Sequence, residues 1–381
     1  MSDYLARSLM CLPMRETTTA ERLAALSRYL ARSLGLAALL VAAACSAAPG
    51  TPPAAPPASA AAAAPAGAPT ASAPAALEPL SYGYTSLGAN QWALYAAEAR
   101  GYLAEQGIAI DENNMGSAAA GVQALASGSL DLTNSNPDPL VRAVASGADL
   151  LFLAGTLNPP IYSLYGQKDI TSLDGLRGRT IIVGGPKDVT VYLLDRMFEP
   201  HGLKRGDYDM VYAGGTPERL RALESGAVQA AILIQPFDFA ARREGYPLLI
   251  DTYDYVKNLP FSSFAVARGW LDHATNRERA TRFLAAVYRG SQDVCDPAQK
   301  EAMIRILADK TQLSDDDARQ TYELLIERTH SIKCDLSLTP DELQQVVNYI
   351  VAMGDLPAPG PDPGRMVDAS VREQGIGRLG G

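Results

Sequence analysis

The feature that most constrains this chain is an alternation of strand-like and helix-like segments that runs through it twice. The first run places the strand patterns PLSYGYTS, IAIDENNMG, LDLTNS and DLLFLAGT between the helix patterns NQWALYAAEARGYLAEQG, AAAGVQALASG and PDPLVRAVASG. The second run starts near Ile170 and has the strands RTIIVGG, YDMVYAGG and AVQAAILIQPF and the helices KDVTVYLLDRMFEPHG and TPERLRALESG. Such alternation is typical of α/β units around a largely parallel sheet, so the sequence predicts two α/β lobes.

Helix signals dominate the chain from Thr275 onward. New helices are expected after Asp296 and after Thr339, where Glu342 stands three residues past the cap and completes a capping box. In the second α/β run, Thr216 is the expected N-cap of a helix whose first position is proline. The folded part is expected to end near Leu356, because PAPGPDPG and a Gly-rich tail follow.

The N-terminal segment has the pattern of an export signal. Arginines precede an apolar run from Leu34 to Ala44, and small residues close the run. The run is about eleven residues long, whereas a helix that spans the hydrocarbon core needs roughly twenty. We therefore interpret residues 1–44 as a cleaved signal rather than a buried core helix, with Met1 or Met14 as the start.

A linker is expected after the signal, over residues 45–78. From Ser46 to Ala76 the chain is almost wholly Ala, Pro, Ser, Gly and Thr, and it carries neither a charge nor an aromatic ring. Such a segment cannot bury enough apolar surface to offset the entropy of ordering it, so we expect it to stay extended and disordered. Cys45 stands at the junction between the signal and this linker.

The charge of the chain argues against a nucleic-acid partner. The 381 residues have a formal net charge of −9. Residues 1–44 contribute five arginines against three acids, a net of +2, so their removal takes the charge from −9 to −11. No basic stripe is present that could replace phosphate counterions, and an acidic surface favours a soluble protein.

Two cysteines lie in the predicted folded part, Cys295 and Cys334, whereas Cys11 falls in the signal. An exported protein matures where disulfides persist, so we predict that this pair is bonded. The alternative is two unrelated buried thiols, because sequence spacing does not show that two Cα atoms approach each other.

Catalytic patterns are scarce. The histidines His201, His273 and His330 lie in different segments, and no CxxC or HxxxH spacing occurs that would suggest a metal site. The chain has no G-x-S-x-G, P-loop or G-x-G-x-x-G motif, and VGGPKD lacks the GK[ST] ending of a phosphate loop. We expect no catalytic residue, no metal and no cofactor.

Small or polar loops recur where a strand ends and a helix begins: YTSLGANQW, NMGSAAAG, TNSNPDP, VGGPKDVT and IQPFD. In open α/β sheets the loops at the carboxyl ends of strands line the ligand crevice, and free N–H groups at helix starts bind polar ligand atoms. Each loop alone could be an ordinary turn, but five in two blocks favour a cleft between the lobes. The candidate ligand-binding residues are Tyr84, Ser86, Gln91, Trp92, Ser117, Asn134, Asn136, Asp138, Gly185, Asp188, Thr190, Gln235, Phe237 and Asp238.

A family resemblance covers roughly Leu80 to Ile350. AEARGYLAEQGI resembles the A-x-x-x-G-[YF]-F-x-x-x-G-[LI] segment of ABC-transporter substrate-binding proteins of the sulfonate/nitrate/thiamine-precursor type, with Leu103 in place of the usual Phe. VQALASGSLDLTNSNPDP, LDGLRGRTIIVGG and ERLRALESGAVQAAILIQPFDFAARREGY resemble the segments that follow in that family.

The resemblance implies a type II periplasmic-binding-protein fold: two lobes of mixed sheets flanked by helices, with the C-terminal helices packing on lobe one. It places lobe one at residues 79–166, lobe two at 167–257, the return to lobe one at 258–356 and a tail at 357–381. A monomer that captures a small organic solute and delivers it to an ABC permease is the implied function.

The resemblance also gives Cys45 a role. Some members of that family are lipoproteins, cleaved before a cysteine that receives a lipid anchor. The usual lipobox has Leu three residues before the cysteine, where this chain has Ala42. The same letters fit cleavage by ordinary signal peptidase, so the expected location is either a membrane-anchored lipoprotein or the periplasm.

The loops suggest the class of solute. They contain no arginine, although a sulfonate or carboxylate is commonly clamped by one, and Lys187 is their only cation. Asp138, Asp188 and Asp238 can accept hydrogen bonds from amino groups, although each could equally be a helix cap or a solvated loop charge. These residues favour a neutral or amine-bearing heteroaromatic solute held between aromatic rings.

Two alternatives use the same fold. One is an enzyme that resembles the synthase of the thiamine pyrimidine, which needs a histidine in the cleft and a cysteine-rich motif that this sequence lacks. The other is a sensor that passes a solute signal to a membrane partner, and it would use the same cleft.

Overall fold

The computed structural model describes residues 76–85 and 87–380, all of which belong to one compact unit of the chain. The predictions of an export signal, of a lipidated Cys45 and of ligand contact at Ser86 lie outside the described residues, as does most of the predicted linker. None of the helices in the described part is long and apolar enough to cross a membrane.

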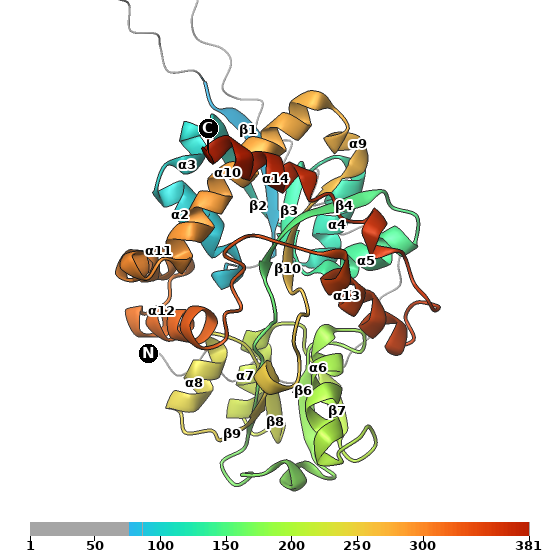
Figure 1. The fold of residues 1–381 in the computed structure, drawn as a ribbon. Coiled ribbons are helices and arrows are strands. Elements are labelled where there is room, and N and C mark those ends of the chain that lie inside the picture. The colour runs from blue at the N-terminus through green and yellow to red at the C-terminus, as the bar shows by residue number, and fades with distance from the viewer. Residues whose placement is uncertain (1–75, 86, 381) are drawn as a thin grey trace, which may run out of the picture. The chain divides into compact units, whose positions relative to one another are not determined.

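Two five-stranded sheets form two lobes (Figure 1). The lobe-one sheet has the order β2-β1-β3-β10-β4, built from β1 (Glu78–Tyr84), β2 (Ile108–Asn114), β3 (Leu132–Ser135), β4 (Leu150–Leu157) and β10 (Ser262–Ala267). The lobe-two sheet has the order β7-β6-β8-β5-β9, built from β5 (Ser163–Gly166), β6 (Thr180–Val183), β7 (Asp209–Tyr212), β8 (Ala230–Leu233) and β9 (Leu248–Asp251).

The two sheets have the same topology. In each, four strands run parallel to one another, and the fourth position of the order is taken by the one antiparallel strand, β10 in lobe one and β5 in lobe two. Each of these strands follows a crossing between the lobes, at residues 158–162 and 252–261. Lobe two therefore begins at Ser163 and not at residue 167 as predicted, because β5 pairs with β8 and β9.

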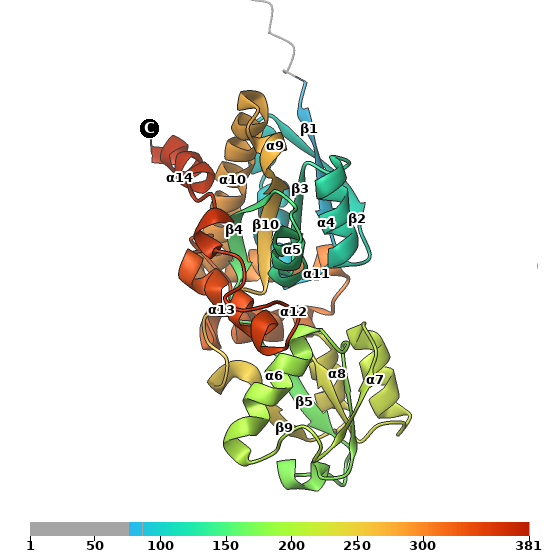
Figure 2. The same ribbon diagram turned by 90° about the vertical axis from the view of Figure 1, so that its right-hand side faces the viewer.

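The helices cover both faces of each sheet (Figures 1 and 2). In lobe one, α2 (Trp92–Ala99) and α10 (Ala274–Cys295) pack together on one face, and α4 (Ala118–Ser127), α5 (Pro137–Ala145) and α13 (Pro340–Ala352) cover the other. In lobe two, α6 (Val189–Phe198) covers one face, and α7 (Thr216–Glu224) and α8 (Phe237–Arg243) cover the other. The remaining helices are α3 (Tyr102–Glu105), α9 (Arg268–Leu271), α11 (Lys300–Thr311), α12 (Asp315–Tyr322) and α14 (Ser370–Gly377).

The strand ends of lobe one are level with one another. Tyr84 at the end of β1 pairs with Asn114 of β2 and with Asn134 of β3. The loops that follow these strands therefore leave the sheet at the same edge, as expected for the carboxyl ends of parallel strands. In lobe two Val183, at the end of β6, pairs with Tyr212, at the end of β7, so that sheet has an equivalent edge.

Most of the helix starts predicted from local sequence signals are confirmed. The predicted capping box of α13 is present, because Thr339 and Glu342 bond each other's backbone N–H groups. The start of α7 differs from the prediction, since Gly215 is the cap and Thr216 is the first helical residue. The predicted disulfide between Cys295 and Cys334 is confirmed, with Cα atoms 5.9 Å apart.

The prediction that the fold ends near Leu356 is wrong. The backbone N–H of Phe152 donates to the carbonyl of Met366 at 2.7 Å, and that of Asp368 donates to the carbonyl of Phe152 at 2.9 Å, so the C-terminal segment extends the edge of lobe one at β4. Helix α14 then packs on α10, where a Cβ at Gly375 would lie 2.8 Å from the carbonyl oxygen of Thr281. The glycines that suggested a loose tail thus allow a close helix contact.

Candidate functional site

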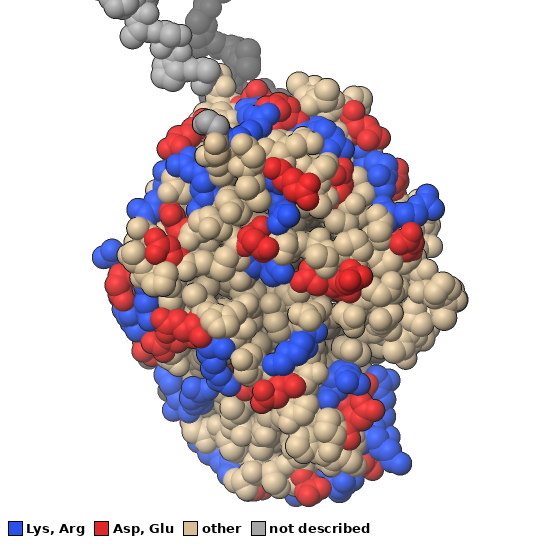
Figure 3. Space-filling view, viewed as in Figure 1, with Lys and Arg blue, Asp and Glu red and all other residues tan. Residues whose placement is uncertain are grey.

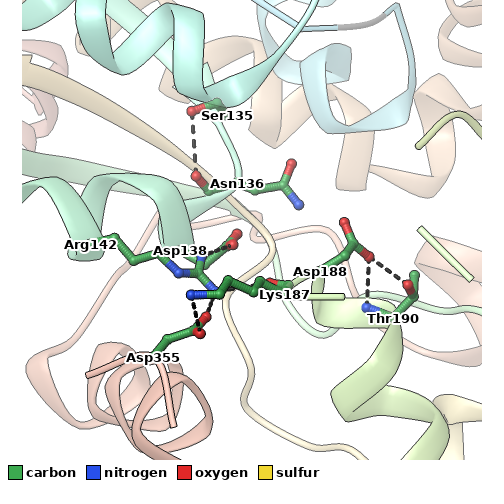
Figure 4. Close-up of polar contacts among 8 residues, drawn as sticks. All are labelled: Ser135, Asn136, Asp138, Arg142, Lys187, Asp188, Thr190 and Asp355. Carbon is green, nitrogen blue, oxygen red and sulfur yellow. Dashed lines mark hydrogen bonds and ion pairs between the residues drawn. The ribbon is translucent and has the colours of Figure 1, made fainter. Parts of the chain in front are cut away.

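The loops of the two lobes meet on one side around Arg142 of α5. Its guanidinium bonds the Asp138 carboxylate of its own helix, donates to Asp355 Oδ2 at 3.1 Å, and donates to the backbone carbonyl of Lys187 at 3.0 Å. Lys187 lies in the β6–α6 loop of lobe two, and its Nζ is 2.9 Å from Asp355 Oδ1. Figure 4 shows Arg142 between the two carboxylates, with Lys187 alongside. This network joins lobe one to lobe two.

An aromatic contact continues the same junction. Tyr192 of α6 stacks on Tyr349 of α13, with ring centroids 5.0 Å apart and an interplanar angle of 27°. Offset stacking of this kind adds about 0.5–1.5 kcal/mol beyond the apolar area that it buries. Helix α6 of lobe two is therefore held against α13 of lobe one by both polar and aromatic contacts.

The N-terminus of α6 is capped by Asp188, which is the alternative that the sequence left open beside the predicted ligand contact. Asp188 Oδ1 accepts hydrogen bonds from the Thr190 backbone N–H at 2.9 Å and from the Thr190 hydroxyl at 2.5 Å. The Thr190 hydroxyl in turn accepts the Gly184 N–H at 2.9 Å, which fixes the loop that contains Gly185. The carboxylate thus occupies the position that an anion would take at a helix N-terminus.

Asp138 places an acidic side chain at the start of a lobe-one helix, as Asp188 does in lobe two. It lies in the first turn of α5, and burial raises the pKa of its carboxyl although the bonds with Arg142 act in the opposite direction. Asn136 precedes it as a half-buried N-cap whose side chain makes no capping bond. In Figure 4 the Asn136 amide projects away from Arg142, and ligand contact by Asn136 stays a prediction.

A second junction lies on the opposite flank, between α8 and α12. Arg243 of α8 forms an ion pair with Asp317 of α12, and Arg328 contacts Asp251 of β9 at 3.3 Å. Arg328 ends a π-helical segment, Glu323–Arg328, that continues α12. A cavity of about 440 Å³ lies between these elements, and its walls include residues of both lobes.

Asp238 lines that cavity rather than standing in an open loop. Only 2% of it is exposed, and burial raises the pKa of its carboxyl to about 7. Its Oδ1 accepts the Phe239 N–H at 2.9 Å. The neighbouring predictions are less buried: Gln235 donates to the Ile161 carbonyl at 3.3 Å, and Phe237 packs on the lobe-two core. Ligand contact by these three residues stays a prediction.

The prediction for Trp92 needs correction. The residue is fully buried, its indole N–H donates to the Met303 carbonyl at 3.0 Å, and its ring meets the edge of Tyr322 at 5.9 Å. Trp92 therefore packs α2 against α11 and α12, and no face of its ring is open to a solute. A helical period shows that one face is apolar, but it does not show which distant helix covers that face.

Two further candidates are buried in the sheet edge of lobe one. Asn134 is fully buried, donates to the Asn90 carbonyl at 3.2 Å and accepts the Ser262 hydroxyl. Gln91 is also buried and accepts the Tyr82 hydroxyl, while its Nε2 has no partner among the described residues. The side chains of both residues bond other groups of lobe one, so direct contact with a solute would need these bonds to rearrange.

The remaining lobe-one candidates lie closer to the surface. Tyr84 is half-buried at the end of β1, with its ring 6.5 Å from that of Tyr82. Ser117 is exposed and caps α4 by accepting the Ala120 N–H at 3.2 Å. Neither placement tests ligand contact, and both residues stay predictions.

An arginine does reach the junction, although the loops themselves have none. Arg142 reaches the junction from the body of α5, whereas Arg219 of α7 bonds residues of lobe two. Arg219 is 2% exposed and donates to the carbonyls of Ile232, Ala213 and Gly214 and to the Thr216 hydroxyl. It holds the loop before α7 in place. Acid and arginine at positions 138 and 142, one helical turn apart, were the available signal.

The histidines are spread over the surface of the described chain. His201 bonds the Tyr255 hydroxyl at 2.8 Å, His273 precedes α10, and His330 follows the π-helical segment. Among residues 76–85 and 87–380, no group of three His, Cys, Asp or Glu side chains is arranged to hold a metal. Figure 3 shows basic and acidic side chains intermixed on the visible face.

Two lobes with sheets of one topology, joined by two crossings, define a periplasmic-binding-protein fold, and solved structures of such proteins resemble it. The nitrate-binding protein NrtA of Synechocystis PCC 6803 has a TM-score of 0.65 at 16% identity, over 80% of this chain and 89% of that one. The alkanesulfonate-binding protein SsuA of Xanthomonas axonopodis pv. citri has a TM-score of 0.60 at 19% identity, over 76% of this chain and 98% of that one.

The sequence itself gives the family. The NMT1/THI5-like family model matches residues 89–300, so the chain belongs to that family. YtlA of Bacillus subtilis (strain 168), to which a binding role is ascribed, is 22% identical over 274 residues, which are 69% of this chain and 80% of that protein.

Proposed function

We propose that this protein is an extracytoplasmic solute-binding protein of an ABC import system. It captures a small organic solute between its lobes and presents it to a permease. The observation that carries the proposal is the contact of loops from two lobes of one topology, around Arg142 and Asp188, in a chain of the NMT1/THI5-like family. Lobes joined by two crossings can close on a ligand by hinge motion.

The solute is proposed to be neutral or amine-bearing, with a heteroaromatic ring as the preferred class. Helix N-termini attract anions, but α5 and α6 each carry an aspartate in that position, and Asp188 already uses the α6 donors. Arg142 is engaged by Asp138 and Asp355, and Lys187 also pairs with Asp355, so two aspartates offset the charge of these two cations. This distinguishes the proposed solute from those named for NrtA and SsuA.

Export and anchoring complete the proposal. Residues 1–44 are proposed to direct export, and Cys45 to carry the lipid that holds the protein at the membrane. Mass spectrometry of the N-terminal peptide from the membrane fraction tests this, with Cys45→Ala as the control. A peptide that begins at Cys45 with added acyl mass supports anchoring, and a mature N-terminus without lipid contradicts it.

A binding role is proposed over an enzymatic one. The synthase-like alternative needs a histidine in the cleft, and His201, His273 and His330 are all exposed in different segments. The synthase that this alternative resembles binds pyridoxal phosphate through a lysine Schiff base, which absorbs in the near ultraviolet and visible range. Absorbance of the purified protein in that range would therefore favour the enzyme.

The function is tested first by native mass spectrometry of the freshly purified full-length protein, which should reveal a co-purified small molecule. Thermal shift then compares 4-aminopyrimidine with nitrate and methanesulfonate. We expect saturable stabilisation by the aminopyrimidine probe and none by the anions. Saturable stabilisation by nitrate or methanesulfonate alone would overturn the proposed solute class. Binding of neither class, with no co-purified molecule, would count against the proposed function itself.

A further inference from the structure

We propose that Arg142 and Asp355 are positioning residues that hold the β6–α6 loop of lobe two, Gly184–Asp188, in its closed place against lobe one. We call these two residues with Lys187 the interlobe latch. The proposed function enters only through the place of this loop at the solute site. The latch itself is a statement about how the lobes are held, and it is measurable without any solute.

The latch is built on a desolvated pair. The Asp355 side chain is 6% exposed and that of Arg142 is 24% exposed, and each Asp355 oxygen has its own cationic partner. Burial alone would raise the pKa of the Asp355 carboxyl, but the bonds from Lys187 and Arg142 outweigh burial and lower it. Charge-assisted hydrogen bonds in such surroundings are about twice as strong as neutral ones.

The three residues of the latch contribute unequally to holding the β6–α6 loop. The Lys187 side chain is 73% exposed, and solvent screens an ion pair of that kind until little of it remains. Arg142 instead reaches the Lys187 backbone carbonyl, so its grip on the loop does not depend on the lysine side chain. Asp138 and Asp355 hold the guanidinium from two directions and orient it toward that carbonyl. Within the latch, the Arg142 guanidinium is therefore the group that holds the loop of lobe two.

The position of the loop matters because its backbone continues into the α6 cap. Thr190 bonds both Gly184 and Asp188, so a displacement of the loop also moves the N-terminus of α6. The Tyr192–Tyr349 stack lies one turn further along α6 and moves with it. A closed state that is populated before solute arrives raises the apparent affinity in proportion to its population.

Hydrogen exchange of the full-length protein, measured without solute, tests the latch. We compare Asp355→Asn and Arg142→Gln with the wild type and read the amides of residues 184–190. Hydrogen bonds to charged groups shift an equilibrium roughly ten- to hundredfold, so we expect exchange in this segment to quicken by at least roughly tenfold. Lys187→Gln should change it by less than about threefold, because the backbone carbonyl remains.

Arg277→Gln is the matched control. Arg277 pairs with Asp368 at 2.8 Å, with side-chain exposures of 33% and 21%, and both residues lie in lobe one. We expect this variant to lower the urea midpoint without changing exchange at 184–190. The proposal is overturned if Asp355→Asn and Arg142→Gln leave that exchange within about twofold of the wild type. It is equally overturned if Arg277→Gln quickens it as much, since the effect would then be general destabilisation.

Discussion

Asp238→Asn should remove a pH-dependent cost to stability that the wild-type protein carries. The carboxyl is 2% exposed at the start of α8, and burial raises its pKa from 3.8 to about 7, against opposing contributions from the Phe239 N–H and Arg242. Across the lobe boundary it faces Asp317, whose charge raises the pKa further. The folded protein therefore holds this proton more tightly than the unfolded chain does.

The sign follows from that difference. A group with a raised folded-state pKa binds more protons in the folded state between the two pKa values, so stability falls as pH rises through this range. A shift from 3.8 to about 7 weakens the free energy of unfolding by about 2–3 kcal/mol between pH 5 and pH 8. Asparagine has the same shape, can still accept the Phe239 N–H and does not titrate.

Urea denaturation at pH 5, 6.5 and 8 measures the effect for the wild type and for Asp238→Asn. The variant should already be more stable than the wild type by about 1–2 kcal/mol at pH 5, and it should gain about a further 2–3 kcal/mol relative to the wild type by pH 8. Asp169→Asn, an exposed position of the same lobe, is the control and should show no such trend. A difference between wild type and Asp238→Asn that stays constant with pH would refute the reasoning.

Three further substitutions test the packing. Gly375→Ala should destabilise by about 1–3 kcal/mol and speed exchange in α14, since its Cβ would lie 2.8 Å from a backbone oxygen, whereas Gly377→Ala meets nothing within 4 Å and should be nearly neutral. Replacing Cys295 and Cys334 by serine should cost about 4 kcal/mol in urea denaturation. Trp92→Phe should lower the urea-derived stability by about 1–3 kcal/mol, because a buried carbonyl loses its donor. No effect of Trp92→Phe would contradict its placement in the core.

Strands that alternate with helices were predictable, including four-residue strands such as β6 and β8, whereas β5 and β9 were not. β1, β2 and β4 span seven or eight residues and carry a continuous apolar or alternating pattern. β5 (SLYG) and β9 (LLID) each adjoin a crossing between the lobes instead of standing between two helices, so the alternation of strands and helices does not mark them. Their place comes from pairing with each other and with β8, which is a property of the assembled sheet.

In the candidate site, contacts between residues close in sequence were predictable, and contacts between distant residues were not. The Asp188 cap spans two residues and was visible as a helix start, because the bond is local. The Arg142–Asp355 contact joins residues 213 positions apart, and no local pattern marks it. Trp92 was misplaced for the same reason, since its partner Met303 lies 211 positions away. Local chemistry was predictable, and its partners were not.

The contacts between the lobes come largely from the C-terminal helices. Lobe two is held on one flank by Asp317 of α12 and on the other by Tyr349 and Asp355, in and just after α13. All three lie beyond residue 300, where the match to the NMT1/THI5-like family model ends. Nine of the ten described strands, β2 to β10, lie within that match, and β1 directly precedes it. The matched segment therefore builds the sheets, and the helices after it set how the lobes meet. Two chains that share those sheets can accordingly differ in how readily their lobes close, through substitutions remote from the solute loops.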